Sequence, residues 1–238
     1  MPKRSKRYQK ELSFLHEKFS AKEMTSGVSV EAALKALIEA CSVNFDPTVD
    51  LSVNLGIDPR KAEQNVRGFA VLPEGLGREV KVAVFARGPK AEEAKQAGAD
   101  YVGAEDLVAL IQEGKIFFNS VIATPDCMTL VAKVGKILGP KGLMPNPKTG
   151  TVTTDVANAV KDAKAGKVEF KNDKGGTIHV PVGKVSFGLS RLLSNIKAVT
   201  SAINRSKPQT IRGNFIKSAF LSHSQGPSVN IKISELTL

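Results

Sequence analysis

The sequence predicts a mixed α/β and α+β protein of two domains, in which one domain is built from both ends of the chain and the other is inserted between them. Two observations support this prediction. Strand and helix patterns alternate from residue 80 to residue 165, which is typical of a parallel, doubly wound sheet. The strands predicted on either side of that region lack partners within their own segments, so we expect them to share one domain.

Within the inserted region, apolar spacing defines each element. We expect strands at Val80 to Ala86, Tyr101 to Gly103 and Ser120 to Ala123, and helices at Lys90 to Ala97, Ala104 to Ile111, Asp126 to Leu138 and Asp155 to Ala165. The turn after the first strand, from Ala86 to Pro89, lacks the G-x-G-x-x-G pattern of a nucleotide site. A doubly wound sheet is therefore predicted without a dinucleotide.

The segments on either side of this region show different apolar patterns. Apolar residues from Val30 to Cys41 form a helical stripe after the cap candidate Ser29, and Val49 to Leu55 alternates as a half-buried strand. Later segments are expected to form a hairpin of Val168 to Phe170 with Ile178 to Val182 across the turn Asn172 to Gly176, a helix from Leu189 to Ile203, and strands at Asn214 to Ser222 and Val229 to Ile233 around the turn Gln225 to Ser228.

These elements place the domain boundaries. Residues 1–74 and 166–238 are expected to form the discontinuous α+β domain, and residues 75–165 the inserted Rossmann-like α/β domain. The chain crosses between them twice, at Leu72 to Gly77 and at Lys164 to Gly166. Paired short connections of this kind predict a hinge.

Charge indicates the kind of partner. The net charge is +11, and residues 166–238 contain 11 basic and only 3 acidic side chains. No carboxylate lies between Asp173 and Glu235. A segment of one sign repels itself unless it meets a polyanion, which favours nucleic acid as the partner, with an acidic membrane surface as the second choice.

Other function classes lack support in the sequence. No apolar run approaches the length of a membrane span, and the basic N-terminus leads into no apolar signal core. The two cysteines, Cys41 and Cys127, lie far apart among apolar neighbours, and no motif links a histidine to a nucleophile. We therefore expect no catalytic residues, no metal and no cofactor.

The loop from Gly139 to Gly150 is rich in glycine, proline and lysine and contains no carboxylate, which predicts a shaped, exposed, positive loop. It resembles a phosphate-binding loop with one glycine replaced by Pro147. Pro147 lacks the N–H that would cradle a phosphate, and a helix pattern rather than a strand precedes the loop, which argues against nucleotide binding.

Taken together, these segments resemble the family of the first protein of the large ribosomal subunit. The resemblance covers nearly the whole chain. Its most specific marker is the loop just described, and it is joined by the segments Phe45 to Val49, Gly56 to Lys61, Gln64 to Gly68 and Gly226 to Ser228.

The resemblance implies a structural protein of the ribosome that forms the mobile stalk beside the tRNA exit site. It implies binding of large-subunit ribosomal RNA by the domain made from both termini, help in release of exit-site tRNA, and repression of the protein's own operon through its messenger RNA. A monomer outside the ribosome and a cytoplasmic location are expected. The family pattern carries RNA contact onto Phe45, Thr48, Asp50, Asp173, Lys174, Ser218, Ser224, Gln225 and Gly226.

Several points stay open at this level. Phe45 either stacks on RNA or belongs to the core. Lys141 and Lys148 either face ribosomal RNA or tRNA, or they lie on a loop whose shape serves mainly to bury Leu143 and Met144 against its own domain. The family commonly has lysine at the position of Asn44 and methionine at that of Gln225, which predicts weaker RNA binding here, offset in part if His223 donates to RNA.

Two other functions compete with ribosomal RNA binding. A hydrolase or transferase using the α/β domain would need a catalytic motif, and the basic excess lies outside that domain. A DNA-binding repressor would need a groove-reading motif such as a helix-turn-helix, which the sequence does not contain.

Overall fold

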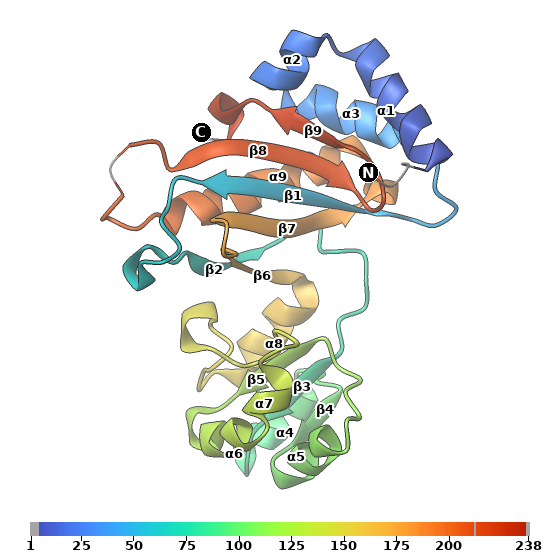
Figure 1. Cartoon of the computed structure of the whole chain (residues 1–238). Helices are drawn as coiled ribbons and strands as arrows, with labels where there is room; N and C mark the ends of the chain where they lie inside the picture. Colours follow the sequence, from blue (N-terminus) through green and yellow to red (C-terminus); the bar gives the residue numbers. More distant parts are fainter. Residues whose placement is uncertain (1–4, 212, 237–238) are drawn as a thin grey trace. The chain divides into compact units, whose positions relative to one another are not determined.

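The computed structural model describes residues 5–211 and 213–236, apart from the side chains of Ala62 and Lys148. These residues form two compact units, one from the chain up to Gly77 together with the chain from Val168 onward, and one from Arg78–Lys167. The first holds an antiparallel sheet to which both ends of the chain contribute, and the second holds a parallel sheet (Figure 1). This confirms the mixed α/β architecture predicted from the sequence.

The antiparallel sheet of the first unit has the strand order β7-β1-β8-β9. Its strands are β1 (Thr48–Leu55), β7 (Thr177–Lys184), β8 (Ile216–His223) and β9 (Ser228–Ile231). The central strand β1 alternates between buried and half-buried residues along its whole length, as predicted. It pairs with β7 on one side and β8 on the other, so segments more than 120 residues apart in the chain meet on one strand.

Within the part of the chain that the structure describes, helices cover one face of this sheet and leave the other uncovered. Two helices, α3 (Val30–Ala40) and α9 (Gly188–Arg205), share a core with the buried side chains of β1, β7 and β8. The α3 helix begins where the sequence predicts, because the Ser29 hydroxyl accepts a hydrogen bond from the Ala32 N–H. Figure 1 shows the sheet from its other face, with α9 behind it.

The predicted hairpin of residues 168–182 is wrong. β6 (Lys167–Lys171) pairs with β2 (Arg67–Val71) in a separate two-stranded sheet, whereas β7 pairs with β1. Only one bridge, from Asn172 to Ile178, joins the two segments across the turn. Buried Asn172 explains the separation, because its side-chain oxygen accepts from the Val66 N–H at 2.9 Å and so ties the end of β6 to the segment before β2.

The sequence analysis missed three elements of the first unit: α1 (Lys6–Lys18), α2 (Ala21–Ser26) and β2. A signal for α1 was present, since Tyr8, Leu12 and Leu15 recur at helical spacing after the N-cap Ser5, although the helix buries only Glu11 and Leu15. A signal for α2 was present, since Ser20 and Glu23 form a capping box around its first turn.

The parallel sheet of the second unit has the order β4-β3-β5, with helices on both faces. Alternate residues of β3 face opposite cores: Ala83 and Phe85 pack with α5, α6 and α7, whereas Val82 and Val84 pack with α4 and α8. The elements of this unit are β3 (Val82–Phe85), α4 (Pro89–Gln96), β4 (Tyr101–Gly103), α5 (Glu105–Gln112), β5 (Ser120–Ala123), α6 (Met128–Lys133), α7 (Gly135–Leu138) and α8 (Val156–Ala165).

The single helix predicted from Asp126 to Leu138 is divided. A 3-10 turn at Pro125–Cys127 leads into α6, and the helix breaks at Val134 before the short α7. The following loop packs close to this break, because the Met144 sulfur lies 3.3 Å from the point where a Cβ on Gly135 would stand. The side chain of the loop therefore packs against the helix backbone.

Candidate nucleic-acid interface

The uncovered face of the antiparallel sheet is polar. Because side chains alternate along a strand, the residues between the core positions all point to this face, and they are half-buried or exposed. Hydroxyl and amide groups predominate, with one imidazole and one exposed aromatic ring. The members of this open face are Thr48, Asp50, Ser52 and Asn54 from β1, Thr177, His179 and Pro181 from β7, Ser218, Phe220 and Ser222 from β8, and Ser228 and Asn230 from β9.

Four of the predicted contact residues meet at one end of the open face, at the turn between β8 and β9. The Ser224 N–H donates to the Thr48 carbonyl at 2.9 Å, and the Thr48 N–H donates to the Ser224 hydroxyl at 3.3 Å. Gln225 and Gly226 follow directly in the same turn. The structure therefore brings Thr48, Ser224, Gln225 and Gly226 together, although β1 and the turn lie more than 170 residues apart in sequence.

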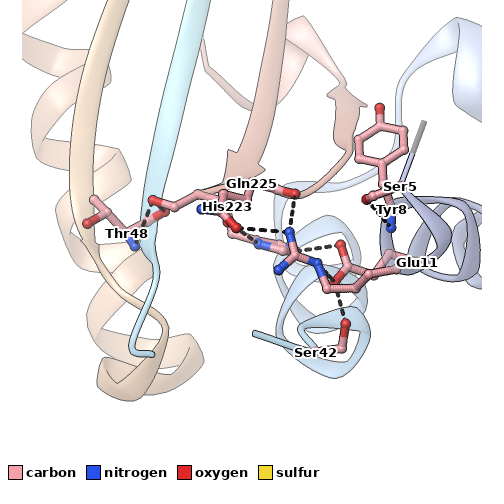
Figure 2. Close-up of polar contacts among 9 residues, drawn as sticks. Ser5, Tyr8, Glu11, Ser42, Thr48, His223 and Gln225 are labelled. Carbon is pink, nitrogen blue, oxygen red and sulfur yellow. Dashed lines mark hydrogen bonds and ion pairs between the residues drawn. The ribbon is translucent and has the colours of Figure 1, made fainter. Parts of the chain in front are cut away.

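A buried histidine shapes this turn. His223 is only 2% exposed, and its Nε2 lies 3.8 Å from Oε2 of buried Glu11 (Figure 2). A Cβ at Gly226 would stand 2.1 Å from the imidazole Cε1, so no larger residue fits at that position. The suggestion that His223 donates to RNA is wrong, because packing against Glu11 and Gly226 withdraws the ring from the surface.

A second group of predicted residues lies at the opposite end of the open face. Ser218 stands opposite Asn54 on β1, and the turn that carries Asp173 and Lys174 leads into β7 beside the same residue. Four residues of β1 separate this end from Asp50, a distance of about 13 Å at the usual rise of a strand. The predicted set is thus split into two clusters joined by the sheet face.

Asp173 shapes its turn rather than presenting a free carboxylate. Its Oδ1 accepts from the backbone N–H groups of Thr177 and Gly175, each at 2.8 Å. The Thr177 bond is the main cause that lowers the pKa of the Asp173 carboxyl from its ordinary value, and the Gly175 bond adds to it. Lys174 is exposed beside it and is available to a phosphate.

Asp50 lies between the two clusters on the open face. Burial raises the pKa of its carboxyl above the ordinary value, and the charge of nearby His179 opposes that rise. His179 itself stands opposite Ser52, whose hydroxyl lies 3.0 Å from the imidazole Nδ1. A partly desolvated carboxyl beside an imidazole can accept hydrogen bonds from ribose hydroxyls.

Phe45 lies in the loop that leads into β1 and is 49% exposed, so it does not belong to the core. The loop is fixed by Asp46, whose carboxylate accepts from the backbone N–H and the hydroxyl of Ser186. The Lys184 ammonium donates to the Asp46 carbonyl at 3.0 Å. Phe45 is therefore held at the surface near the Thr48 end of the open face.

Sequence reasoning missed Phe220, which is 36% exposed at the centre of the open face, between Ser52 and Asn230 on the neighbouring strands. A signal was present: the alternation of β8 places residue 220 in phase with Ser218 and Ser222. An aromatic ring on an uncovered polar sheet is a stacking surface for an unpaired base.

Lys141 and Lys148 belong to the other unit. Lys141 is exposed, and the side chain of Lys148 lies outside the described part of the chain. Leu143 packs against the core formed by α5, α6 and α7, and Thr149 and Thr151 are buried and joined by their hydroxyls at 3.0 Å. The loop is shaped by its own unit, and Lys141 is the described lysine that it presents.

A comparison with known families identifies the family of the chain. The sequence pattern of the Ribosomal protein L1p/L10e family matches residues 35–227, which is most of the chain. The chain belongs to this family. It is accordingly a non-enzymatic structural protein of the large ribosomal subunit that binds ribosomal RNA, as the resemblance implied. The enzyme and DNA-repressor alternatives are set aside.

The matched region includes β1, β7, β8 and the turn up to Pro227, and therefore almost the whole open face of this L1p/L10e family member. It begins within α3 and leaves α1 and α2 outside. Among the described residues, no helix has the length and apolarity to cross a membrane. Within the same residues, no three metal-binding side chains are grouped to hold an ion.

Proposed function

We propose that the open face and its two flanking turns bind a folded segment of large-subunit ribosomal RNA, and that the protein thereby forms the mobile stalk beside the tRNA exit site. In that position it assists release of the exit-site tRNA. A similar fold in the messenger RNA of its own operon is bound by the same surface, which makes the protein a translational repressor. It acts in the cytoplasm and is a monomer until it joins the subunit.

The chemistry of the open face carries this proposal. A concentration of small hydroxyl and amide side chains on an uncovered sheet suits recognition of sugar edges and 2′-OH groups, which a protein must approach closely. Gly175 is exposed in the turn at one end, and Gly226 at the other lets His223 pack against the backbone and so fixes the shape of that turn. Phe45 and Phe220 add two exposed rings on which unpaired bases can stack.

Lysines supply the sequence-independent part of the affinity. Lys174 stands at one end of the open face, and Lys184 lies opposite Thr48 at the other. Lys217 is exposed beside Ser218. Each ammonium that neutralises a phosphate releases a counterion, so binding should weaken with salt.

We further propose that the two compact units correspond to two domains, residues 1–74 with 166–238 and residues 75–165, and that the double crossing between them is a hinge. Gly166 supports the second crossing, because it ends α8 with φ of 106°, a conformation that favours glycine. Motion at the hinge would let the stalk follow a departing tRNA. The inserted domain, which carries Lys141 and Lys148, would then move as a unit, and its lysines would contact ribosomal RNA or tRNA.

The test is a titration of the full chain with a stalk fragment of large-subunit ribosomal RNA and with a scrambled RNA of equal length, at several salt concentrations. We expect tight binding to the stalk fragment that persists at salt concentrations where the scrambled RNA is released. Lys174→Met should weaken binding and reduce the slope of log affinity against log salt by about one. The matched control is Lys95→Met, an exposed lysine on α4 of the other unit, which should change neither.

Equal, salt-sensitive binding of both RNAs would reduce the interface to simple charge attraction. An equal effect of the Lys174 and Lys95 substitutions would contradict the placement of the RNA on the open face. Because both lysines are exposed, neither substitution should alter folding, which a thermal melt monitored by circular dichroism would verify.

A further inference from the structure

The N-terminal helix α1 makes a direct contact with the turn between β8 and β9. Nη2 of Arg7 donates to the backbone carbonyl of Gln225 at 3.2 Å and to its side-chain Oε1 at 3.0 Å. The two residues are 218 positions apart in the chain. Helix α1 lies outside the region matched to the family, whereas the turn that it contacts lies inside that region.

Gln225 is held in an unusual conformation by this contact. Among the described residues it is the non-glycine residue with positive φ, at 64°. Arginine can only donate, so the amide atom that faces Arg7 must be the oxygen. The amide NH₂ of Gln225 consequently points away from Arg7 and keeps two donors for another partner. A methionine at this position could offer neither the acceptor nor the donors.

A pocket opens beside this contact. It has a volume of about 600 Å³ and is lined by Ser5, Arg7, Tyr8 and Gln225. That volume falls within the range of sites that hold small organic groups. The lining combines an aromatic ring, a planar guanidinium and an amide, which are the groups that proteins use to stack an unpaired base and to read its edge.

A buried cluster beneath the pocket fixes Arg7 and remains incompletely paired. Glu11 is 3% exposed and accepts from the Ser42 hydroxyl at 2.6 Å, while its Oε1 lies 3.7 Å from Arg7 Nε (Figure 2). Arg7 Nε, Glu11 Oε2 and His223 Nε2 are buried and have no hydrogen-bond partner among the described residues. The arrangement holds the Arg7 guanidinium in place beside the pocket.

The electrostatics of α1 suit an RNA strand. Its first turn contains no acidic residue, although helix N-termini favour acidic side chains, and it contains Lys6 and Arg7 instead. The positive end of the helix dipole and these two cations together attract phosphate. The turn that forms the opposite wall of the pocket already carries Ser224, Gln225 and Gly226, three of the predicted RNA contacts.

We propose that this pocket binds one unstacked nucleotide of the RNA that docks on the open face, an inference that rests on the proposed function. The base stacks on the Tyr8 ring and the Arg7 guanidinium, and the amide NH₂ of Gln225 donates to an acceptor on the base edge. Glu11 and His223 are positioning residues, which hold Arg7 and the turn in place. At this position the protein therefore reads RNA by hydrogen bonding and stacking rather than through an apolar contact.

The experiment combines protein variants with single abasic substitutions along the unpaired nucleotides of the stalk fragment. Tyr8→Leu and Arg7→Met should each weaken binding of the unmodified fragment by about tenfold, in line with the loss of one stacked base. Lys10→Met removes the same charge from an exposed site on the same helix and should cost far less. Removal of the base at one position should weaken RNA binding by the wild-type protein by a similar factor. The same abasic RNA should bind the Tyr8→Leu variant no more weakly than the unmodified RNA does.

The outcomes separate this inference from the function on which it rests. If the wild-type chain does not prefer the stalk fragment to scrambled RNA, the proposed function fails. If it shows that preference but Tyr8→Leu and Arg7→Met bind as Lys10→Met does, the pocket does not hold a nucleotide. If every abasic position weakens wild type and Tyr8→Leu equally, the base is not read here. Tyr8→Phe keeps the ring and should retain near-normal affinity, which guards against a merely misfolded Tyr8→Leu.

Discussion

Replacing Gly226 by alanine should lower the free energy of unfolding by about 3 kcal/mol, at the upper end of the usual cost of overpacking, and should sharply weaken binding of the ribosomal RNA fragment. The new methyl group would stand 2.1 Å from Cε1 and 2.3 Å from Nε2 of His223. The imidazole cannot withdraw easily, because it is 2% exposed and faces buried Glu11. The turn must therefore move, and with it Ser224 and Gln225.

Chemical denaturation and RNA titration of the same preparation would measure both effects. Gly213→Ala is the matched control in the same unit: Gly213 has φ of 99° but nothing within 4 Å of an added Cβ. It should cost only the backbone strain of a positive φ, about 1 to 2 kcal/mol, and should leave RNA binding nearly intact. Equal losses in the two variants would show that the His223 packing does not shape the turn.

Asn195→Leu should lower the free energy of unfolding by about 3 kcal/mol or more, because it leaves three backbone groups without partners. Asn195 is fully buried on α9. Its side-chain oxygen accepts from the Glu74 N–H at 3.1 Å, and its NH₂ donates to the carbonyls of Gly75 at 3.1 Å and Val182 at 2.7 Å. One side chain thus ties the first crossing segment to the edge of β7.

The same variant should loosen that segment, so amide hydrogen exchange at Gly75 and its neighbours should accelerate more than in the core strands. Asn204→Ala on the same helix is the comparison, since its side chain donates a single hydrogen bond, to the Leu236 carbonyl at 2.9 Å. We expect it to cost about 1 kcal/mol. Similar costs for both asparagines would mean that Asn195 does not anchor the crossing.

Local patterns predicted those elements whose burial follows a simple period. The alternation of Val49 to Leu55 identified β1 and its covered face, and the strand and helix alternation after residue 80 identified the parallel sheet. Pairing was harder. Nothing local shows that β6 pairs with β2, because that choice depends on Asn172, whose side chain reaches the Val66 N–H. The close packing of Met144 from the following loop on Gly135 likewise has no signal in the local pattern.

The candidate site shows the same division. Family resemblance selected Thr48, Ser224, Gln225 and Gly226, and the structure brings them to one turn. The groups that support this turn were not predictable, because Glu11 contacts His223 from a helix that lies more than 200 residues away in the chain. The sequence around His223 suggested a surface hydrogen-bond donor, because nothing in it shows that α1 packs over the ring and buries it.

Hydroxyl-radical footprinting of the full chain, with and without the ribosomal RNA stalk fragment, tests most directly the claim that the open face is the RNA-binding surface. Phe45 and Phe220 are 49% and 36% exposed, so both should be oxidised in the free protein and protected in the complex. Phe117 is 62% exposed in the other unit and should be oxidised equally in both states. Protection of Phe117 and Met144, with Phe45 and Phe220 oxidised as in the free protein, would contradict the assignment.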